Sequence, residues 1–129
     1  MADYKEYIVR VYKNRTEWKN KEGRFHREDG PAIECADGDK FWYQNGELHR
    51  DGGPACEYTK GDKSWYKNGN LHREDGPARE YANGYKVWYI NGRELSEKEF
   101  NNRNKKEFSM DEIAKALGVN ASELKIKKD

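Results

Sequence analysis

Three histidines are the residues of this chain that look most suited to chemistry. His26, His49 and His72 are each followed directly by an arginine, and an acidic residue stands two positions after each histidine. Histidine beside a carboxylate is a common pairing in general acid–base catalysis, and histidine also binds metal ions. The pattern therefore admits three interpretations: a catalytic group, a repeated metal site, or a structural role.

The spacing of the histidines favours the structural role. They lie 23 residues apart, whereas an enzyme needs a single constellation of catalytic groups. The second copy reads Asp51-Gly52-Gly53 and lacks the acidic pair of the other two, a change that a turn tolerates better than an acid–base site does. We expect each histidine to pair across strands and the Asp-Gly segments to form turns. No catalytic residue, metal site or cofactor is predicted.

The two cysteines also give no sign of a chemical site. Cys35 and Cys56 occupy different positions of successive copies, and neither zinc nor redox spacing is present. Reduced thiols in a cytosolic protein are the expected state.

Many other positions share the 23-residue period, which identifies a repeat. The copies lie near residues 18–41, 42–64 and 65–87, with a partial copy at 88–95, and the first carries one extra residue before Gly23. Together they define a repeat domain at 1–95. The residues in register are Trp42, Trp65 and Trp88; Pro31, Pro54 and Pro77; and Gly46, Gly69 and Gly92.

Each copy reads as β-hairpins. An Asn-Gly pair follows each Trp-Tyr run, and this pair suits the positive φ of a two-residue hairpin turn. We predict a single-layer antiparallel β-meander of repeated hairpins. Because side chains alternate along a strand, the tryptophans should line one face and the tyrosines the other. The predicted strands lie near 40–44, 47–50, 54–59, 63–67, 70–73, 77–82 and 86–90.

The segment WYKNGNLHREDGPAREYANGYK, residues 65–86, resembles a divergent MORN repeat (membrane occupation and recognition nexus). That family also repeats at 23 residues, with an aromatic residue, an Asn/Asp-Gly turn and a following histidine. Here Arg-Glu-Asp-Gly-Pro replaces the family's Gly-x-Gly, and the aromatic-Gly-Glu stretch is missing. The HREDGPA form is similar to small repeat proteins of bacteriophages and large DNA viruses. The resemblance covers roughly residues 14–100 and implies the fold more strongly than a function.

Residues 96–129 predict a helical tail that caps the sheet. Ser96 with Glu99 and Ser109 with Glu112 form capping boxes, which predict helices near 97–103 and 110–117. The string FSMDEIAKALGVNASELKI also resembles the first two helices of a helix-turn-helix unit, although its second helix lacks side chains for reading bases. The apolar residues expected to cover the sheet end are Phe100, Phe108, Ile113, Leu117, Val119 and Leu124.

The composition bounds the possible partners. The chain is 34% hydrophobic and 38% charged with a net charge of +1, so bulk charge gives no strong case for nucleic acid. The N-terminus has no apolar signal-peptide region, and no stretch reaches transmembrane length. We therefore expect a cytoplasmic protein without membrane insertion, located in the host cytoplasm if phage-encoded.

The repeated aromatic and arginine rows are the predicted binding surface. An exposed aromatic row tends to mark an interface, although both rows could also be ordinary packing of a thin sheet. The leading hypothesis is a phage-encoded, non-enzymatic protein-binding module whose partner is a host or phage protein, and the viral resemblance adds inhibition of a host defence factor as a refinement. Nucleic-acid binding through the arginine row or the tail is the alternative, and a small-ligand binder or enzyme is the third hypothesis. Open sheet edges also suggest a homodimer. The candidate binding residues are Trp42, Trp65, Trp88, Tyr43, Tyr66, Tyr89, Arg27, Arg50 and Arg73.

Overall fold

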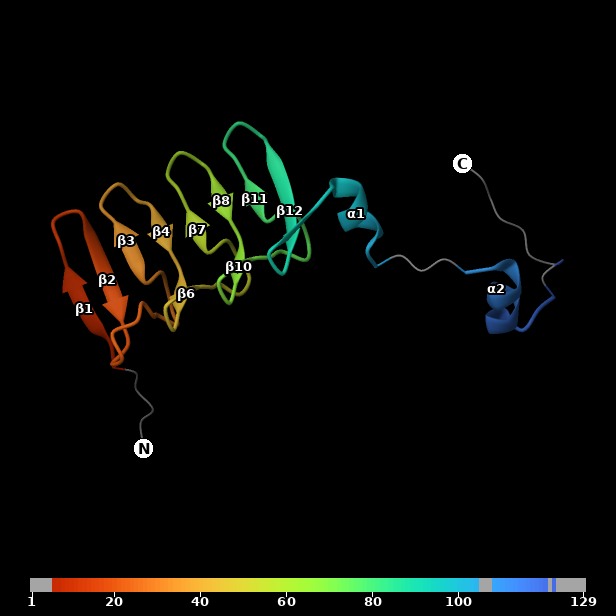
Figure 1. Ribbon diagram of the computed structural model, residues 1–129, viewed down its shortest axis with the longest axis horizontal. Helices are drawn as coiled ribbons and strands as arrows, with labels where there is room; N and C mark the ends of the chain where they lie inside the picture. Colours follow the sequence, from red (N-terminus) through yellow and green to blue (C-terminus); the bar gives the residue numbers. More distant parts are fainter. Residues whose placement is uncertain (1–5, 105–107, 121, 123–129) are drawn as a thin grey trace.

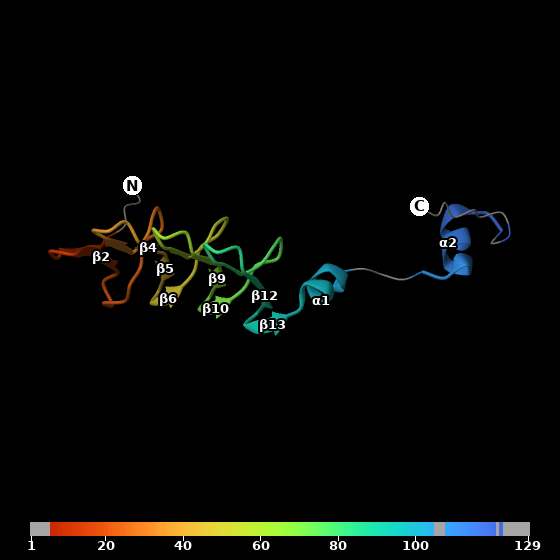
Figure 2. The same cartoon turned by 90° about the horizontal axis from the view of Figure 1, so that it is seen from above.

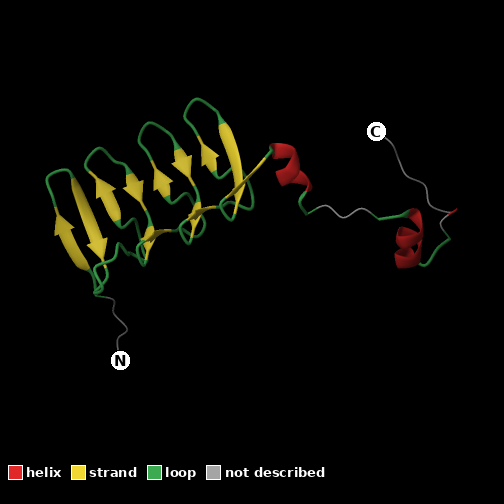
Figure 3. Ribbon diagram, viewed as in Figure 1, coloured by secondary structure: helices red, strands yellow, loops and turns green. Residues whose placement is uncertain are grey.

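The fold is mainly β, as the repeat predicted. The computed structural model describes residues 6–104, 108–120 and 122. It contains a nine-stranded antiparallel sheet, two small two-stranded sheets and two short helices. The strands follow one another along the long sheet as a meander (Figure 1). Figure 3 shows the same short strands and turns recurring from one end of the sheet to the other.

Along the chain, pairs of strands in the long sheet alternate with pairs of strands that form the small hairpin sheets. The long sheet runs in the order β1-β2-β3-β4-β7-β8-β11-β12-β13, and the small sheets are β5-β6 and β9-β10. The strands of the long sheet are β1 (Ile8–Val11), β2 (Arg15–Lys19), β3 (Ile33–Cys35), β4 (Lys40–Phe41), β7 (Cys56–Glu57), β8 (Lys63–Ser64), β11 (Arg79–Glu80), β12 (Lys86–Ile90) and β13 (Arg93–Leu95). The hairpin strands are β5 (Tyr43–Gln44), β6 (Glu47–Leu48), β9 (Tyr66–Lys67) and β10 (Asn70–Leu71).

Two of the predicted strands, 40–44 and 63–67, are divided at their tryptophan. The N–H of Trp42 donates to the carbonyl of Ala55 in the long sheet, while the carbonyl of Trp42 accepts from His49 in the hairpin. Trp65 bonds in the same way to Ala78 and His72. The chain therefore leaves one sheet and enters the other at each tryptophan, and Figure 2 shows β6 and β10 to one side of the long sheet.

Each repeat adds two strands to the long sheet. β4 pairs with β7, β7 with β8, and β8 with β11. Neighbouring strands lie about 4.8 Å apart, so equivalent residues of successive repeats are about 9.5 Å apart across the sheet.

One face of the sheet carries a ladder of alternating charges. Lys40 lies opposite Glu34 on one side and Glu57 on the other, and Lys63 lies between Glu57 and Glu80 in the same way. Opposite charges directly across an antiparallel pair each stabilise the sheet by a few tenths of a kcal/mol, roughly. The ladder favours the observed register, because a shift of one residue would remove these opposite-charge pairs.

The buried core is thin. Ala32, Ala55 and Ala78, the residues after each repeat proline, are 0% exposed. No large side chain among the described residues is fully buried. This agrees with the low mean hydropathy of −1.34, because a single sheet layer has little interior to fill.

Hydrogen bonds join successive repeats at the turn opposite the hairpins. Asp39 Oδ1 accepts from the N–H of Thr59 at 2.8 Å, and Asp62 Oδ1 accepts from the N–H of Ala82 at 2.8 Å. The bond from Ala82, with a further contribution from Lys60, lowers the pKa of Asp62 below its ordinary value. The charged carboxylate is therefore the form that holds the two repeats together.

Helix α1 (Glu97–Asn102) closes the C-terminal end of the sheet. Ser96 forms the predicted capping box with Glu99. Phe100 is 6% exposed, and the guanidinium of Arg103 lies 3.9 Å from the centre of its ring. Arg103 also donates to the carbonyl of Glu74 in the preceding repeat. Ser96 stands where the earlier repeats have their arginine, so the helix begins where the repeat pattern ends.

Helix α2 (Met110–Leu117) begins at Ser109 and ends at Gly118, which has a φ of 70°. Its capping box is the predicted one, but Phe108, Leu117 and Val119 are exposed. Six apolar residues of the tail were predicted to cover the end of the sheet, and Phe100 is the member of that set that is buried among the described residues. Leu124 and most of the second helix-turn-helix segment lie outside the described residues. Within the described part of the chain, no helix has the length and apolar character needed to cross a membrane.

Replacing Phe100 with alanine tests the cap. We expect Phe100→Ala to lower the free energy of unfolding by about 3 kcal/mol, because a buried phenylalanine is lost. Leu117→Ala is the matched control, an apolar residue in the other helix whose removal should change stability by less than about 0.5 kcal/mol. Urea denaturation measures both, and similar losses for the two variants would contradict the capping role.

Candidate functional site

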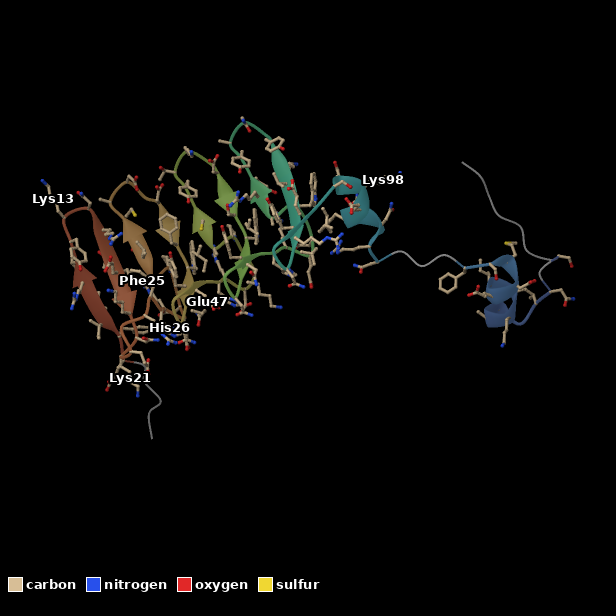
Figure 4. All side chains as sticks on the ribbon, viewed as in Figure 1. Lys13, Lys21, Phe25, His26, Glu47 and Lys98 are labelled. Atoms are coloured by element: carbon tan, nitrogen blue, oxygen red, sulfur yellow. The ribbon has the colours of Figure 1, made fainter. Side chains whose placement is uncertain are left out.

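Each repeat histidine holds the hairpin turn of the next repeat. The Nδ1 atoms of His26, His49 and His72 accept from the backbone N–H groups of Asn45, Asn68 and Asn91 at 3.0, 3.0 and 2.9 Å. A ring nitrogen that accepts carries no proton, so the proton of the neutral ring is on Nε2. Figure 4 shows His26 and Glu47 at the same end of the sheet, where the hairpins lie.

The other ring nitrogen is also engaged. Nε2 lies 3.5 Å from Glu28 in the first repeat, 3.2 Å from Asp51 in the second and 3.5 Å from Glu74 in the third. Both nitrogens of each histidine are thus used within the repeat structure. The arrangement orients three turns in the same way in three successive repeats.

Each repeat arginine stacks on the tryptophan of its own repeat. The guanidinium carbons of Arg27, Arg50 and Arg73 lie 4.0, 3.8 and 3.9 Å from the ring centres of Trp18, Trp42 and Trp65. Nη1 of each arginine also donates to a proline carbonyl and to a glutamate of the charged ladder. The side chains are only 21–30% exposed. The guanidinium groups of the predicted arginine row are therefore occupied by contacts within the protein.

A glycine covers the other side of each guanidinium. A Cβ atom added at Gly30, Gly53 or Gly76 would lie 2.9 Å from the arginine Cζ. We call this arrangement of tryptophan, arginine and glycine the Trp–Arg–Gly stack. It accounts for the glycine before each repeat proline, since a Cβ atom there would force the guanidinium to shift away from its proline and glutamate partners.

The remaining predicted binding residues are half-buried. The ring centre of Tyr43 lies 5.3 Å from that of Phe25, and burial raises the pKa of Tyr43. The hydroxyl of Tyr66 accepts a long hydrogen bond of 3.5 Å from Arg79. Trp88 and Tyr89 lie in β12, where the Tyr89 carbonyl accepts from the N–H of Arg73.

Two equivalent grooves lie between successive Arg-to-Pro loops. The first groove has a volume of about 480 Å³ and the second about 530 Å³. Trp42 lines the first and Trp65 the second, one repeat further on. The first groove is lined by Arg27–Pro31, Trp42, Gln44 and His49–Asp51. The second is lined by Arg50–Pro54, Trp65–Lys67 and His72–Asp75.

Exposed carboxylates lie on the rim of both grooves, and the rim of the second groove also carries the exposed side chain of Lys67. The side chains of Asp29, Asp51, Glu74 and Asp75 are 81%, 92%, 77% and 87% exposed. The arginines of the same loops lie beneath them in the Trp–Arg–Gly stacks. The sequence pattern places these acidic residues in turns, and they are not among the predicted binding residues. The signal that could have identified them is the acidic residue that recurs two positions after each repeat histidine.

The described cysteines are not activated nucleophiles. Burial raises the pKa of Cys56 to about 11 and, together with Asp37 and Asp39, raises that of Cys35. A thiol with a raised pKa stays protonated at neutral pH, and the thiolate is the reactive form. Within residues 6–104, 108–120 and 122, no group of three or more His, Cys, Asp or Glu side chains is placed to hold a metal ion.

Comparisons of this chain with protein-family models, curated proteins and solved structures found no match. The MORN resemblance therefore stays a prediction that rests on the residues quoted for it. The grooves and their charges are the features of the chain that bear on its partner.

Replacing Gly53 with alanine tests the Trp–Arg–Gly stack. We expect Gly53→Ala to lower the free energy of unfolding by about 1–2 kcal/mol, because the new methyl group displaces a guanidinium with fixed partners. In an Arg50→Ala background the same substitution should cost little, since no guanidinium is left to displace. A double-mutant cycle by urea denaturation measures the coupling, and additive losses would rule out the steric explanation.

Proposed function

We propose that this chain is a non-enzymatic protein-binding module that uses the two grooves. The observation that carries the proposal is their repetition: two grooves of similar volume, one repeat apart, each with a tryptophan in the wall and exposed carboxylates on the rim. A concave surface with an aromatic side chain in its wall and charged side chains on its rim can hold a partner of complementary charge. Repetition favours an extended partner over a single small molecule.

The contacts of the histidines support binding rather than catalysis. Nδ1 of His49 accepts from the N–H of Asn68, and its Nε2 lies beside Asp51. A general base needs a nitrogen that can reach its substrate. The same contacts recur in the other two repeats, which is what a structural role requires.

The charge of the grooves favours a protein partner over nucleic acid. Arg50 and Arg73 are stacked on tryptophans and paired with Glu57 and Glu80, so they are poorly placed to neutralise phosphates. The exposed carboxylates of the rim would repel a phosphate backbone. We retain the expectation that the chain is phage-encoded, acts in the host cytoplasm and binds a host or phage protein.

Selection from a displayed library of random peptides tests the binding proposal. We expect the wild-type protein to select peptides, and the triple variant Asp51→Asn, Glu74→Gln, Asp75→Asn to lose at least tenfold in affinity for them. The amide oxygens of this variant can still accept from the His49, His72 and Arg73 nitrogens, so its folding should be retained.

The control for that selection is the variant Glu22→Gln, Glu47→Gln, Glu94→Gln, which removes three exposed charges outside the groove linings. It should bind as the wild type does. Selected peptides that bind the triple variant as well as the wild type would contradict a groove-centred site, and a selection that enriches no peptide would contradict the proposal as a whole.

We further propose that the open edge of the sheet forms a homodimer. β1 is the outermost strand, and all four of its residues, Ile8 to Val11, are exposed. Edge strands with few charges pair readily with another chain. Light scattering should therefore give twice the chain mass at micromolar concentration. Val9→Lys, which places a charge on the edge, should give a monomer; a monomeric wild type would contradict the proposal.

A further inference from the structure

Resting on the proposed binding function, we propose that the grooves recognise a polyproline-II segment with a lysine or arginine at every third residue. The proposal names the chemistry of the partner and its conformation. It follows from the spacing of the grooves, the direction in which the side chains of an extended partner point and the charge of the groove rims.

The spacing of the grooves sets the spacing of the groups that they bind. Equivalent points of the first and second grooves are separated by one repeat, which is two strands of the long sheet or about 9.5 Å. A polyproline-II helix rises about 3.1 Å per residue, so three residues span about 9.3 Å. The two periods agree to a few tenths of an ångström.

The side chains of such a segment also point in the right direction. Polyproline-II has three residues per turn, so every third side chain lies on the same side. In a β-strand the third residue points to the opposite face. In an α-helix residues seven apart share a face, but they are about 10.5 Å apart, so the mismatch grows by about 1 Å with each repeat.

The rim carboxylates offer a partner for a cation at each step, and Lys67 is the opposing charge in the lining of the second groove. Asp29 and Asp51 border the first groove, and Asp51, Glu74 and Asp75 border the second. Each of these carboxylates already contacts a histidine or arginine of its own loop, but their side chains are 77–92% exposed, so a lysine or arginine of the partner can still reach them from solvent. An ion pair with a carboxylate is the expected contact. The guanidinium carbons of Arg50 and Arg73 already cover tryptophan rings at 3.8 and 3.9 Å, so the partner's cation meets the rim rather than the ring.

The groove walls suit the residues between the cations. Trp65, Tyr66 and Pro54 line the second groove, and aromatic-lined grooves are a recurrent docking surface for proline-rich segments. A polyproline-II segment also arrives already ordered, which lowers the entropy lost on binding. Each groove would hold the apolar part of one three-residue step.

Two synthetic peptides with equal charge provide the test. Fluorescence anisotropy would compare labelled (Lys-Pro-Pro)₄ with labelled (Lys-Pro-Pro-Pro)₄, in which successive lysines turn away from one another by about 120°. We expect (Lys-Pro-Pro)₄ to bind at least tenfold more tightly, and its affinity to fall at least tenfold in the triple variant Asp51→Asn, Glu74→Gln, Asp75→Asn. The variant Glu22→Gln, Glu47→Gln, Glu94→Gln should bind it as the wild type does.

Other outcomes would overturn the inference. Equal affinity for the two peptides would show attraction by charge alone, and tighter binding of an alanine-rich helical peptide with lysines seven apart would show a helical partner. Failure of (Lys-Pro-Pro)₄ to bind at millimolar concentration would exclude the proposed ligand. If library selection still yields peptides that depend on the groove carboxylates, the binding function stands and only the period and conformation proposed for the partner fall.

Discussion

The contact on which the rest of the structure depends is the stacking of an arginine between a tryptophan ring and a glycine. It attaches each Arg-to-Pro loop to the sheet, because the same guanidinium donates to a proline carbonyl of the loop and to a glutamate of the ladder. Cation–π contacts of this kind contribute about 0.5–2 kcal/mol, depending on how far they are desolvated. With the loops fixed, the spaces between them become grooves of defined shape.

The polar composition and the regular fold have the same cause, which is that the repeats form a single layer of sheet. A single sheet has no thick interior, so alanines suffice at its most buried positions. Order between repeats comes instead from hydrogen bonds at both ends, with histidine at the hairpins and aspartate at the opposite turns. Each of these bonds is net worth about 1 kcal/mol, and their regular recurrence compensates for the small buried apolar area. Stability of this kind is spread along the array, as in other repeat proteins.

The sequence predicted the meander, the Asn-Gly turns and both helix starts, because these depend on local chemistry: Asn45, Asn68 and Asn91 all have the positive φ that their turns require. It did not predict the division of the strands at Trp42 and Trp65, which depends on hydrogen bonds to Ala55 and Ala78 elsewhere in the chain. The candidate site was predicted less well. Arg50 and Trp42 were predicted to be binding residues in exposed rows. In the structure they stack on each other, so the guanidinium covers a face of the ring that a partner would otherwise contact. The exposed carboxylates were recognisable as turn residues, whereas the grooves between them exist only once the repeats are stacked.

The two ends of the sheet differ, and this has a consequence for how such a protein can change in length. Leu95 and Ser96 replace the histidine and arginine of the repeat, so the array terminates there and α1 covers it. Internal copies such as residues 42–64 contain every contact needed to join a copy before and a copy after. Duplicating one would leave both ends as they are and would lengthen the binding surface by one groove at the same pitch. Under the proposed function, the number of copies sets the number of binding grooves, and gene duplication or deletion would match the chain to a longer or shorter ligand without redesign of any contact.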